Sequence, residues 1–198
     1  MISILDYGAG NLRSVQNTLE EIGAEFELVR GADELRRASK IILPGVGHFG
    51  QMMCALDRMQ VREALLEGIR SGVPFLGICL GLQALFEGSE EAPELAGLAL
   101  LPGAIRRFQG DVRVPHMGWD DLEMRPGSRL LQGVEAKPYV YFAHSYFAPV
   151  NDATAAVCTY TVPYCAALEA GNIFGVQFHP EKSGRIGLRI VRNFVELC

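Results

Sequence analysis

A cysteine set between two glycines is the feature of this sequence that points most directly to chemistry. Cys79 separates an apolar stretch, 74–78, which predicts a buried strand, from residues 80–86, which predict a helix. Gly77 and Gly81 stand two residues to either side, a spacing typical of a sharp strand-to-helix turn that presents a nucleophile. The partial positive charge of a helix N-terminus favours the thiolate there. We therefore predict a nucleophilic Cys79, and a buried structural cysteine is the alternative.

A cysteine nucleophile needs a base, and the base needs a group that orients it. Among the four histidines, only His179 lies in a stretch that also supplies an acid, Glu181. Pro180 disfavours helix at His179, so we expect an extended chain in which residues two apart project to the same side. Glu181 would then hold one ring nitrogen of His179 while the other faces Cys79, as in a catalytic triad. The alternative is a surface loop with an incidental His-Pro-Glu.

A glycine-rich turn, 44–47, follows the strand predicted at 40–43. In an open α/β sheet the ends of neighbouring strands form the ligand crevice. The backbone N–H groups of Val46 and Gly47, with that of Leu80, are therefore candidates for the oxyanion hole of a tetrahedral intermediate. An ordinary strand–helix turn is the alternative, and a phosphate loop is not expected because no Gly-Lys-Ser/Thr follows.

Val46 separates two glycines in this turn, and its β-branched side chain resists a positive φ. Gly45 and Gly47 can rotate around it. We hypothesise that the turn has two settings, that the resting one aims no donor at the oxyanion, and that a partner switches it.

A second glycine-rich segment, 8–13, follows a predicted strand and opens a predicted helix, like a dinucleotide fingerprint. Arg13 stands where the third glycine of that fingerprint belongs. We do not expect a nucleotide to bind there.

The first half of the chain alternates predicted strands with predicted helices. The strand patterns cover residues 2–7, 26–29, 40–43 and 74–78. The helical patterns cover residues 12–22, 32–38, 49–70 with a break near Gln60, and 80–86. This alternation predicts an α/β fold in which helices cover both faces of an open, mostly parallel sheet.

After Pro93 the pattern changes to strands separated by turns. We expect these strands at 98–108, 112–116, 139–146, 153–160, 165–170 and 173–178, before a helix at 183–198. They predict a mixed or antiparallel section attached to the parallel core. Without a repeat, linker or low-complexity tract, we predict one domain, 1–198.

The composition limits the possible partners and compartments. A net charge of -5 argues against a nucleic acid or a membrane surface as the main partner. The first residues lack the basic region of a signal peptide, and the longest apolar run, 95–105, is too short to span a bilayer. Five cysteines without a C-x-x-C pair argue against disulfides or a zinc site. We predict a reduced, cytoplasmic protein without a metal, in which the other four cysteines are bystanders.

Two stretches resemble the class I, triad-type glutamine amidotransferases: Gly-Ile-Cys-Leu-Gly-Leu-Gln (77–83) and Gly-Val-Gln-Phe-His-Pro-Glu-Lys-Ser (175–183). Further stretches narrow the resemblance to the family of glutaminase subunits of imidazole glycerol phosphate synthase: 6–12, 44–47, 115–119 and 141–146. The resemblance extends from residue 1 to about residue 195. It implies the flavodoxin-like fold of class I amidotransferases.

The resemblance implies hydrolysis of glutamine to glutamate and ammonia, with no cofactor. Cys79 would attack the carboxamide, His179 would transfer protons and Glu181 would orient His179. The implied glutamine-site residues are Gln83, Glu91, His144, Ser145 and Tyr146. Ammonia would pass to a (β/α)₈-barrel cyclase subunit, in a heterodimer that makes imidazole glycerol phosphate and an aminoimidazole carboxamide ribotide (AICAR) in histidine biosynthesis.

The resemblance also implies a docking surface for that partner. It places Asn11, Met117, Trp119 and Lys182 at the interface; a core aromatic is the alternative for Trp119, the one tryptophan. Asp120 departs from the family pattern, in which we expect Asn after Gly-Trp in many relatives. The departure adds a negative charge near the implied interface.

Three rival interpretations stay open at this point. One is another hydrolase on the same architecture, such as a cysteine peptidase or a deglycase-type enzyme. Another is a non-catalytic regulatory subunit that keeps the fold as a docking module. The third is the glutaminase subunit of a different ammonia-using synthase, such as anthranilate or pyridoxal phosphate synthase.

Overall fold

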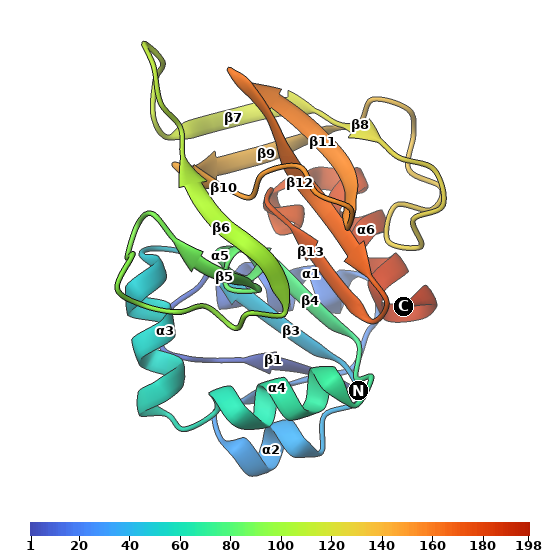
Figure 1. Cartoon of the computed structure of the whole chain (residues 1–198). Coiled ribbons are helices and arrows are strands. Elements are labelled where there is room, and N and C mark those ends of the chain that lie inside the picture. Colours follow the sequence, from blue (N-terminus) through green and yellow to red (C-terminus); the bar gives the residue numbers. More distant parts are fainter.

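The computed structural model describes all 198 residues and is built on one eight-stranded sheet (Figure 1). In spatial order the strands are β2 (Phe26–Val29), β1 (Ile2–Leu5), β3 (Ile41–Gly45), β4 (Phe75–Cys79), β13 (Ile173–Val176), β12 (Val162–Ala170), β11 (Thr154–Tyr160) and β8 (Glu123–Met124). Strands β2 to β13 of this order run parallel, and β12, β11 and β8 continue the sheet in antiparallel fashion. The predicted α/β fold, mostly parallel with antiparallel additions in the second half, is confirmed.

Helices cover both faces of this sheet because alternate strand residues point to opposite sides. Ile4 and Ile42 belong to a buried cluster with α1 (Leu12–Glu21) and α6 (Gly184–Leu197). Leu5 and Leu43 belong to a second cluster on the other face, with α2 (Ala32–Arg36), α3 (Phe49–Arg58) and α4 (Arg62–Arg70). The break predicted near Gln60 separates α3 from α4.

Two smaller sheets lie beside the large one (Figure 1). One joins β5 (Phe86–Ser89), β6 (Leu101–Arg107) and β10 (Tyr146–Phe147). The other pairs β7 (His116–Asp121) with β9 (Tyr139–His144), antiparallel. A short helix, α5 (Leu80–Gln83), and a 3₁₀ turn, η1 (Pro180–Lys182), follow β4 and β13.

Three predicted elements are wrong in their bounds. The strand expected over 139–146 ends at His144, and the next strand, β10, belongs to another sheet. The helix expected over 80–86 ends at Gln83, because Phe86 starts strand β5 and is buried there. The strand expected over 112–116 begins at His116 instead and continues to Asp121. Pro115 has no N–H to give to a strand ladder, which explains why pairing with β9 starts only after it.

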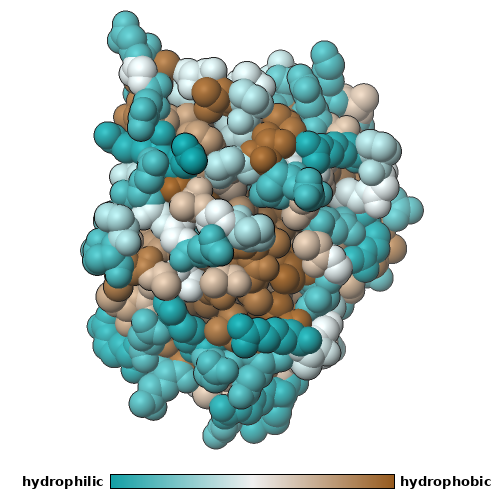
Figure 2. All heavy atoms as spheres, in the orientation of Figure 1, coloured by the Kyte–Doolittle hydropathy of each residue, from teal (hydrophilic) through white to brown (hydrophobic).

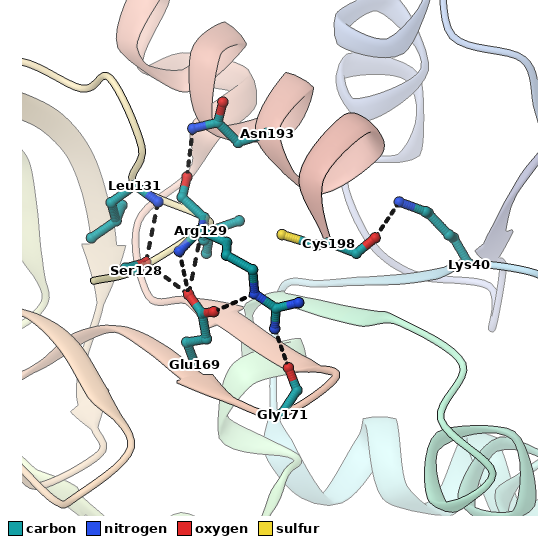
Figure 3. Close-up of polar contacts among 9 residues, drawn as sticks. Lys40, Ser128, Arg129, Leu131, Glu169, Gly171, Asn193 and Cys198 are labelled. Carbon is teal, nitrogen blue, oxygen red and sulfur yellow. Dashed lines mark hydrogen bonds and ion pairs between the residues drawn. The ribbon is translucent and has the colours of Figure 1, made fainter. Parts of the chain in front are cut away.

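Polar contacts hold helix α6 and the loop before β9 against the sheet (Figure 3). Arg129 pairs with Glu169 at 2.8 Å and also donates to the carbonyl of Gly171. Asn193 of α6 donates to the carbonyls of Leu130 and Gln132 at 2.9 and 2.8 Å.

Lys40, which precedes β3, closes the carboxyl end of α6. Its Nζ donates to the carbonyl oxygens of Phe194, Val195 and Cys198 at 2.9, 2.7 and 2.5 Å. The last carbonyls of a helix have no partner within it, so a lysine placed there stabilises the helix end.

The molecular surface is mostly hydrophilic over α2, α3 and α4, with a hydrophobic area between α4 and β6 (Figure 2). None of the helices is both long and apolar enough to cross a membrane.

Candidate active site

Cys79 lies where the sequence predicts it, between the end of β4 and the start of α5. Its φ is 54° and its ψ is -105°, a backbone conformation that a non-glycine residue rarely adopts. A Cβ atom added at Gly77 would lie 2.4 Å from the carbonyl oxygen of Gly81, and one at Gly81 would lie 2.0 Å from that of Leu43. The prediction that this turn requires glycine on both sides is confirmed.

His179 and Glu181 are in direct contact. The Nδ1 atom of His179 lies 2.8 Å from Oε1 of Glu181, and their side chains are 4% and 2% exposed. His179 has extended backbone (φ -98°, ψ 97°), as predicted. The expectation that the extended chain continues to Glu181 is wrong, because Pro180 starts the 3₁₀ turn η1. The turn, rather than strand alternation, brings the carboxylate back to the imidazole.

The charges around His179 favour its protonated form. Burial by itself lowers the pKa of His179. The hydrogen bonds and charges of Cys79 and Glu181 outweigh burial and raise this pKa to about 10. His179 therefore interacts with the sulfur on one side and the carboxylate on the other, and this environment stabilises its imidazolium form.

Asn11 supports the carboxylate. Its Nδ2 donates to Oε1 of Glu181 at 3.3 Å, and its Oδ1 accepts from Ser14 Oγ at 2.8 Å. Asn11 precedes α1, but its side chain makes no capping hydrogen bond to the helix backbone. The second carboxylate oxygen, Oε2, is buried without a hydrogen-bond partner.

Gln177 is a site residue that sequence reasoning missed. Its Nε2 donates to the sulfur of Cys79 at 3.5 Å, and its Oε1 accepts from Gln83 Nε2 at 3.0 Å. Gln83 also donates to the carbonyl of Tyr146 at 2.8 Å. The signal was available, since Gln177 stands two residues before His179 and extended residues two apart share a side.

A pocket of about 230 Å³ opens beside the sulfur of Cys79. It brings together every residue predicted for the oxyanion hole and the glutamine site: Val46, Gly47, Leu80, Gln83, Glu91, His144, Ser145 and Tyr146. Pro115 and Ala143, which the sequence did not single out, complete the lining. The residues come from both halves of the chain, so only the folded molecule forms this pocket.

The turn before α3 forms one wall of the pocket. Gly47 has a φ of +96°, and Val46 is 39% exposed. Glu91 Oε2 accepts a hydrogen bond from the backbone N–H of Phe49 at 2.7 Å, which ties the turn to the opposite wall. Tyr7 lies behind the turn, and its buried hydroxyl is close to the backbone N–H of Val46 without reaching hydrogen-bond geometry.

Three of the four residues implied at a partner interface lie around the pair β7–β9. Met117 and Trp119 are 59% and 55% exposed, so the core alternative for Trp119 is wrong. They stand two apart on β7 and therefore share its outer side. Lys182 lies 5.6 Å above the ring of Tyr141, and Trp119 meets that ring edge-on at 6.1 Å.

Residues 3–197 of the sequence match the family described as glutamine amidotransferase class-I. The chain belongs to this family. The match confirms the resemblance to class I amidotransferases, and it covers nearly the whole chain.

Full-length relatives of this amidotransferase carry a narrower name. The chain is 49% identical over 198 residues to imidazole glycerol phosphate synthase subunit HisH of Methanothermobacter thermautotrophicus, covering 100% of this chain and 98% of that protein. It is 45% identical over 197 residues to the HisH subunit of Deinococcus radiodurans, covering 98% and 92%.

Solved structures support the fold of the amidotransferase. A crystal structure of a glutamine amidotransferase superposes with a TM-score of 0.78 at 20% identity, covering 99% of this chain and 97% of the other. A chain of the PurLQS structure from Thermotoga maritima gives 0.77 at 22% identity, covering 98% and 96%.

Proposed function

We propose that the chain is the glutaminase subunit of an imidazole glycerol phosphate synthase. It hydrolyses L-glutamine to L-glutamate and ammonia. A cyclase subunit uses the ammonia to make imidazole glycerol phosphate and AICAR in L-histidine biosynthesis. The observation that carries the proposal is the sulfur of Cys79 at a pocket, with the buried His179–Glu181 pair behind it. The full-length identity of 45% and 49% to relatives named HisH supports the choice of synthase.

In the first half of the reaction the Cys79 thiolate attacks the carboxamide carbon of glutamine. The carbonyl oxygen becomes an oxyanion, which the backbone N–H groups of Leu80 and of the Val46–Gly47 turn stabilise. His179, protonated and held by Glu181, gives its proton to the departing nitrogen. The C–N bond breaks, ammonia leaves and a thioester remains on Cys79.

In the second half water replaces ammonia. Neutral His179 takes a proton from the water, whose oxygen attacks the thioester carbon. The same oxyanion donors stabilise the second tetrahedral intermediate. Collapse of this intermediate breaks the C–S bond, releases glutamate and restores the thiolate–imidazolium pair.

The pocket supplies groups for the rest of the glutamine molecule. Glu91 offers a carboxylate to the α-ammonium group, and Ser145 and Tyr146 line the same space. Gln83 fixes the Tyr146 carbonyl and, through Gln177, the position of the sulfur. A volume of about 230 Å³ suits one small amino acid.

The proposed partner is a (β/α)₈-barrel cyclase in a heterodimer. Met117 and Trp119 are exposed and belong to residue types that are enriched at the centres of protein interfaces. The charged Lys182 lies beside them, over the ring of Tyr141. Asn11 lies beside Glu181 at the same end of the molecule as η1. In this proposal the enzyme works in the cytoplasm, where its five free cysteines stay reduced.

The test is co-purification with a cyclase of this type, followed by glutamine-dependent formation of imidazole glycerol phosphate. We expect Cys79→Ser to lower glutamine hydrolysis at least about 10³-fold, because the alcohol is a far weaker nucleophile, while partner binding is unchanged. Cys54→Ser is the matched control, since Cys54 is exposed on α3. Full activity of the Cys79 variant would refute the proposed nucleophile.

A further inference from the structure

A row of polar side chains, buried except for Asp120 at its outer end, joins strand β7 to the pocket. Oδ2 of Asp120 lies 3.3 Å from Nε2 of His116, and Nδ1 of His116 lies 3.2 Å from the hydroxyl of Tyr164. That hydroxyl lies 3.3 Å from Nε2 of His144, whose Nδ1 lies 2.9 Å from the carbonyl oxygen of Tyr146. We call these four contacts the polar row. Its last residues, His144 and Tyr146, line the pocket beside Cys79.

Aromatic rings surround the polar row. The ring of His116 stacks on Tyr160 at 4.1 Å and on Phe142 at 4.9 Å. His116, His144 and Tyr164 are 4%, 5% and 0% exposed. With so little water around these three side chains, the contacts among them depend on protons of the row itself, while the Asp120 side chain at the outer end is 30% exposed.

The row needs more protons than its neutral side chains carry. The Tyr146 carbonyl and the Asp120 carboxylate only accept hydrogen bonds, so each of the four contacts requires one proton between its two atoms. Two neutral imidazoles and one phenol supply three protons. One contact is therefore left with two lone pairs facing each other whenever His116 and His144 are neutral and Asp120 is ionised.

The missing proton is best held between Asp120 and His116. Burial lowers the pKa of His144 to about 3, and burial raises the pKa of Tyr164 far above its usual range. His144 therefore stays neutral and Tyr164 stays protonated near neutral pH. Burial also lowers the pKa of His116, and Asp120 opposes this effect, so the added proton binds below pH 6.5.

Other polar groups packed around His116 do not supply the proton. Cys158 on β11 faces both Tyr164 and Asp120, and burial raises the pKa of its thiol to about 12, so its proton stays on the sulfur and does not pass to His116. The hydroxyl of Tyr160, also on β11, donates to the carbonyl of Arg113 at 2.7 Å. Asp121, the next residue of β7, donates its backbone N–H to Oδ1 of Asp120 at 2.9 Å and thereby leaves Oδ2 for His116.

We propose that Asp120, His116 and Tyr164 are positioning residues for the glutamine-binding segment 144–146, and that the polar row closes only when Asp120 and His116 share one added proton. The first part of this inference rests on the proposed function, whereas the second part does not, since the proton uptake does not require glutamine. While the row lacks this proton, the Tyr164 hydroxyl donates to either His116 or His144, and one of the four contacts is left without a hydrogen bond. The added proton fixes His144 and the Tyr146 carbonyl, which also accepts from Gln83.

An Asn at position 120 removes the need for the proton. Because the Asp121 N–H occupies Oδ1, the amide nitrogen of Asn would stand where Oδ2 now faces His116. Its N–H would donate to Nε2, and neutral His116 would then donate from Nδ1 to Tyr164. Asp120→Asn is therefore an isosteric variant in which the row is closed at every pH.

The first test is ¹⁵N NMR of the imidazoles in the full chain, which has four histidines. In the wild-type chain we expect one imidazole, assigned to His116 by its loss in His116→Gln, to change from neutral to imidazolium below pH 6.5. In Asp120→Asn the same ring should stay neutral over this range. Identical titration of the two chains would overturn the proposal, and this result would leave the glutaminase assignment untouched.

The second test separates binding from chemistry in the complex with saturating cyclase partner. Between pH 7.5 and a pH below the His116 titration found in the first test, we expect KM for glutamine to fall roughly fivefold in the wild type relative to the Asp120→Asn variant. This factor corresponds to about one hydrogen bond. The ratio of the two kcat values should not change with pH. Tyr164→Phe interrupts the row, so its KM should be high and should lack this pH dependence. If the ratio of the KM values of wild type and Asp120→Asn does not change with pH, the proposed positioning role is wrong, even if His116 binds the proton. If neither protein hydrolyses glutamine, the proposed function is wrong instead.

Discussion

At the scale of single residues, the candidate site concentrates strain and charge on few atoms. Cys79 has a φ of 54° because the strand, turn and helix on either side fix its neighbours at contact distance. A residue held in this way has its side chain placed before substrate arrives, which favours reaction at a fixed point. In the proposed reaction, protonated His179, held by Glu181, supplies positive charge beside the sulfur.

The first residue-scale prediction concerns the charge of Glu181. In Glu181→Gln the carbonyl oxygen should keep facing His179, because Asn11 donates to that oxygen. The variant therefore removes the negative charge of residue 181 but keeps its hydrogen bond to His179. We expect kcat of the complex to fall on the order of 10²-fold with little change in KM. Glu63→Gln, an exposed carboxylate on α4, is the matched control. An unchanged kcat would contradict the orienting role of Glu181.

The second residue-scale prediction concerns pH and stability. The pKa of His179 is raised to about 10, from 6.5 in an unfolded chain. Its protonation therefore stabilises the fold fully below pH 6.5, and this contribution is lost as the pH rises through 10. We expect the free energy of unfolding in urea to fall between pH 7 and pH 10 by at least about 1 kcal/mol more in the wild type than in Glu181→Gln. If the free energies of unfolding of the two proteins change in parallel with pH, protonation of His179 does not stabilise the fold in this way.

At the scale of elements, the strand-to-helix turn depends on three chain segments packed backbone to backbone. Gly77, Gly81 and the carbonyl of Leu43 leave no room for a side chain. The sequence predicts this strand-to-helix turn correctly, but it predicts a helix after the turn that is too long. Residues 80–86 are apolar throughout, so periodicity alone cannot tell where helix α5 ends and strand β5 begins.

The element-scale prediction compares two glycines. A Cβ at Gly81 would meet backbone at 2.0 Å, whereas the nearest atom to a Cβ at Gly88 in β5 is 3.8 Å away. We expect Gly81→Ala to lower the free energy of unfolding by about 3 kcal/mol or more, since backbone must move. Gly88→Ala should change it by less than about 0.5 kcal/mol. Urea unfolding measures the free energy of unfolding of both variants. Equal values would mean that the turn at Gly81 accommodates a Cβ atom with little strain.

At the scale of the whole molecule, the site joins two regions that are far apart in the sequence. Strands β3 and β4 bring Val46 and Cys79 to one edge of the sheet, and β13 brings His179 to the same edge. The pair β7–β9 closes the pocket with residues 143–146 and turns its other side outward. Met117 pairs directly with Ala143, which lines the pocket, so a partner bound over Met117 and Trp119 would lie on the same strand pair as the proposed glutamine site.

The whole-molecule prediction concerns that surface. Because Trp119 is 55% exposed, Trp119→Ala should change the free energy of unfolding by less than about 1 kcal/mol. As an interface residue it should nevertheless weaken binding of the cyclase partner at least about tenfold. Leu28→Ala is the control, since Leu28 is 39% exposed on the edge strand β2 at the other end of the sheet. Calorimetric titration gives both affinities, and equal values would place the interface elsewhere.

The sequence by itself determined the fold class, the strand-to-helix turn at Cys79 and the His-Pro-Glu segment. Glycine spacing, proline and strand–helix alternation each constrain the backbone over a few neighbouring residues, so these features can be predicted locally. Only the tertiary structure decided that Gln177 touches the sulfur, that a 3₁₀ turn returns Glu181 to His179, and that Asp120 ends a buried row leading to Tyr146. Those contacts join positions from separate strands. Their distances follow from how the sheets pack, and local sequence patterns carry no information on that packing.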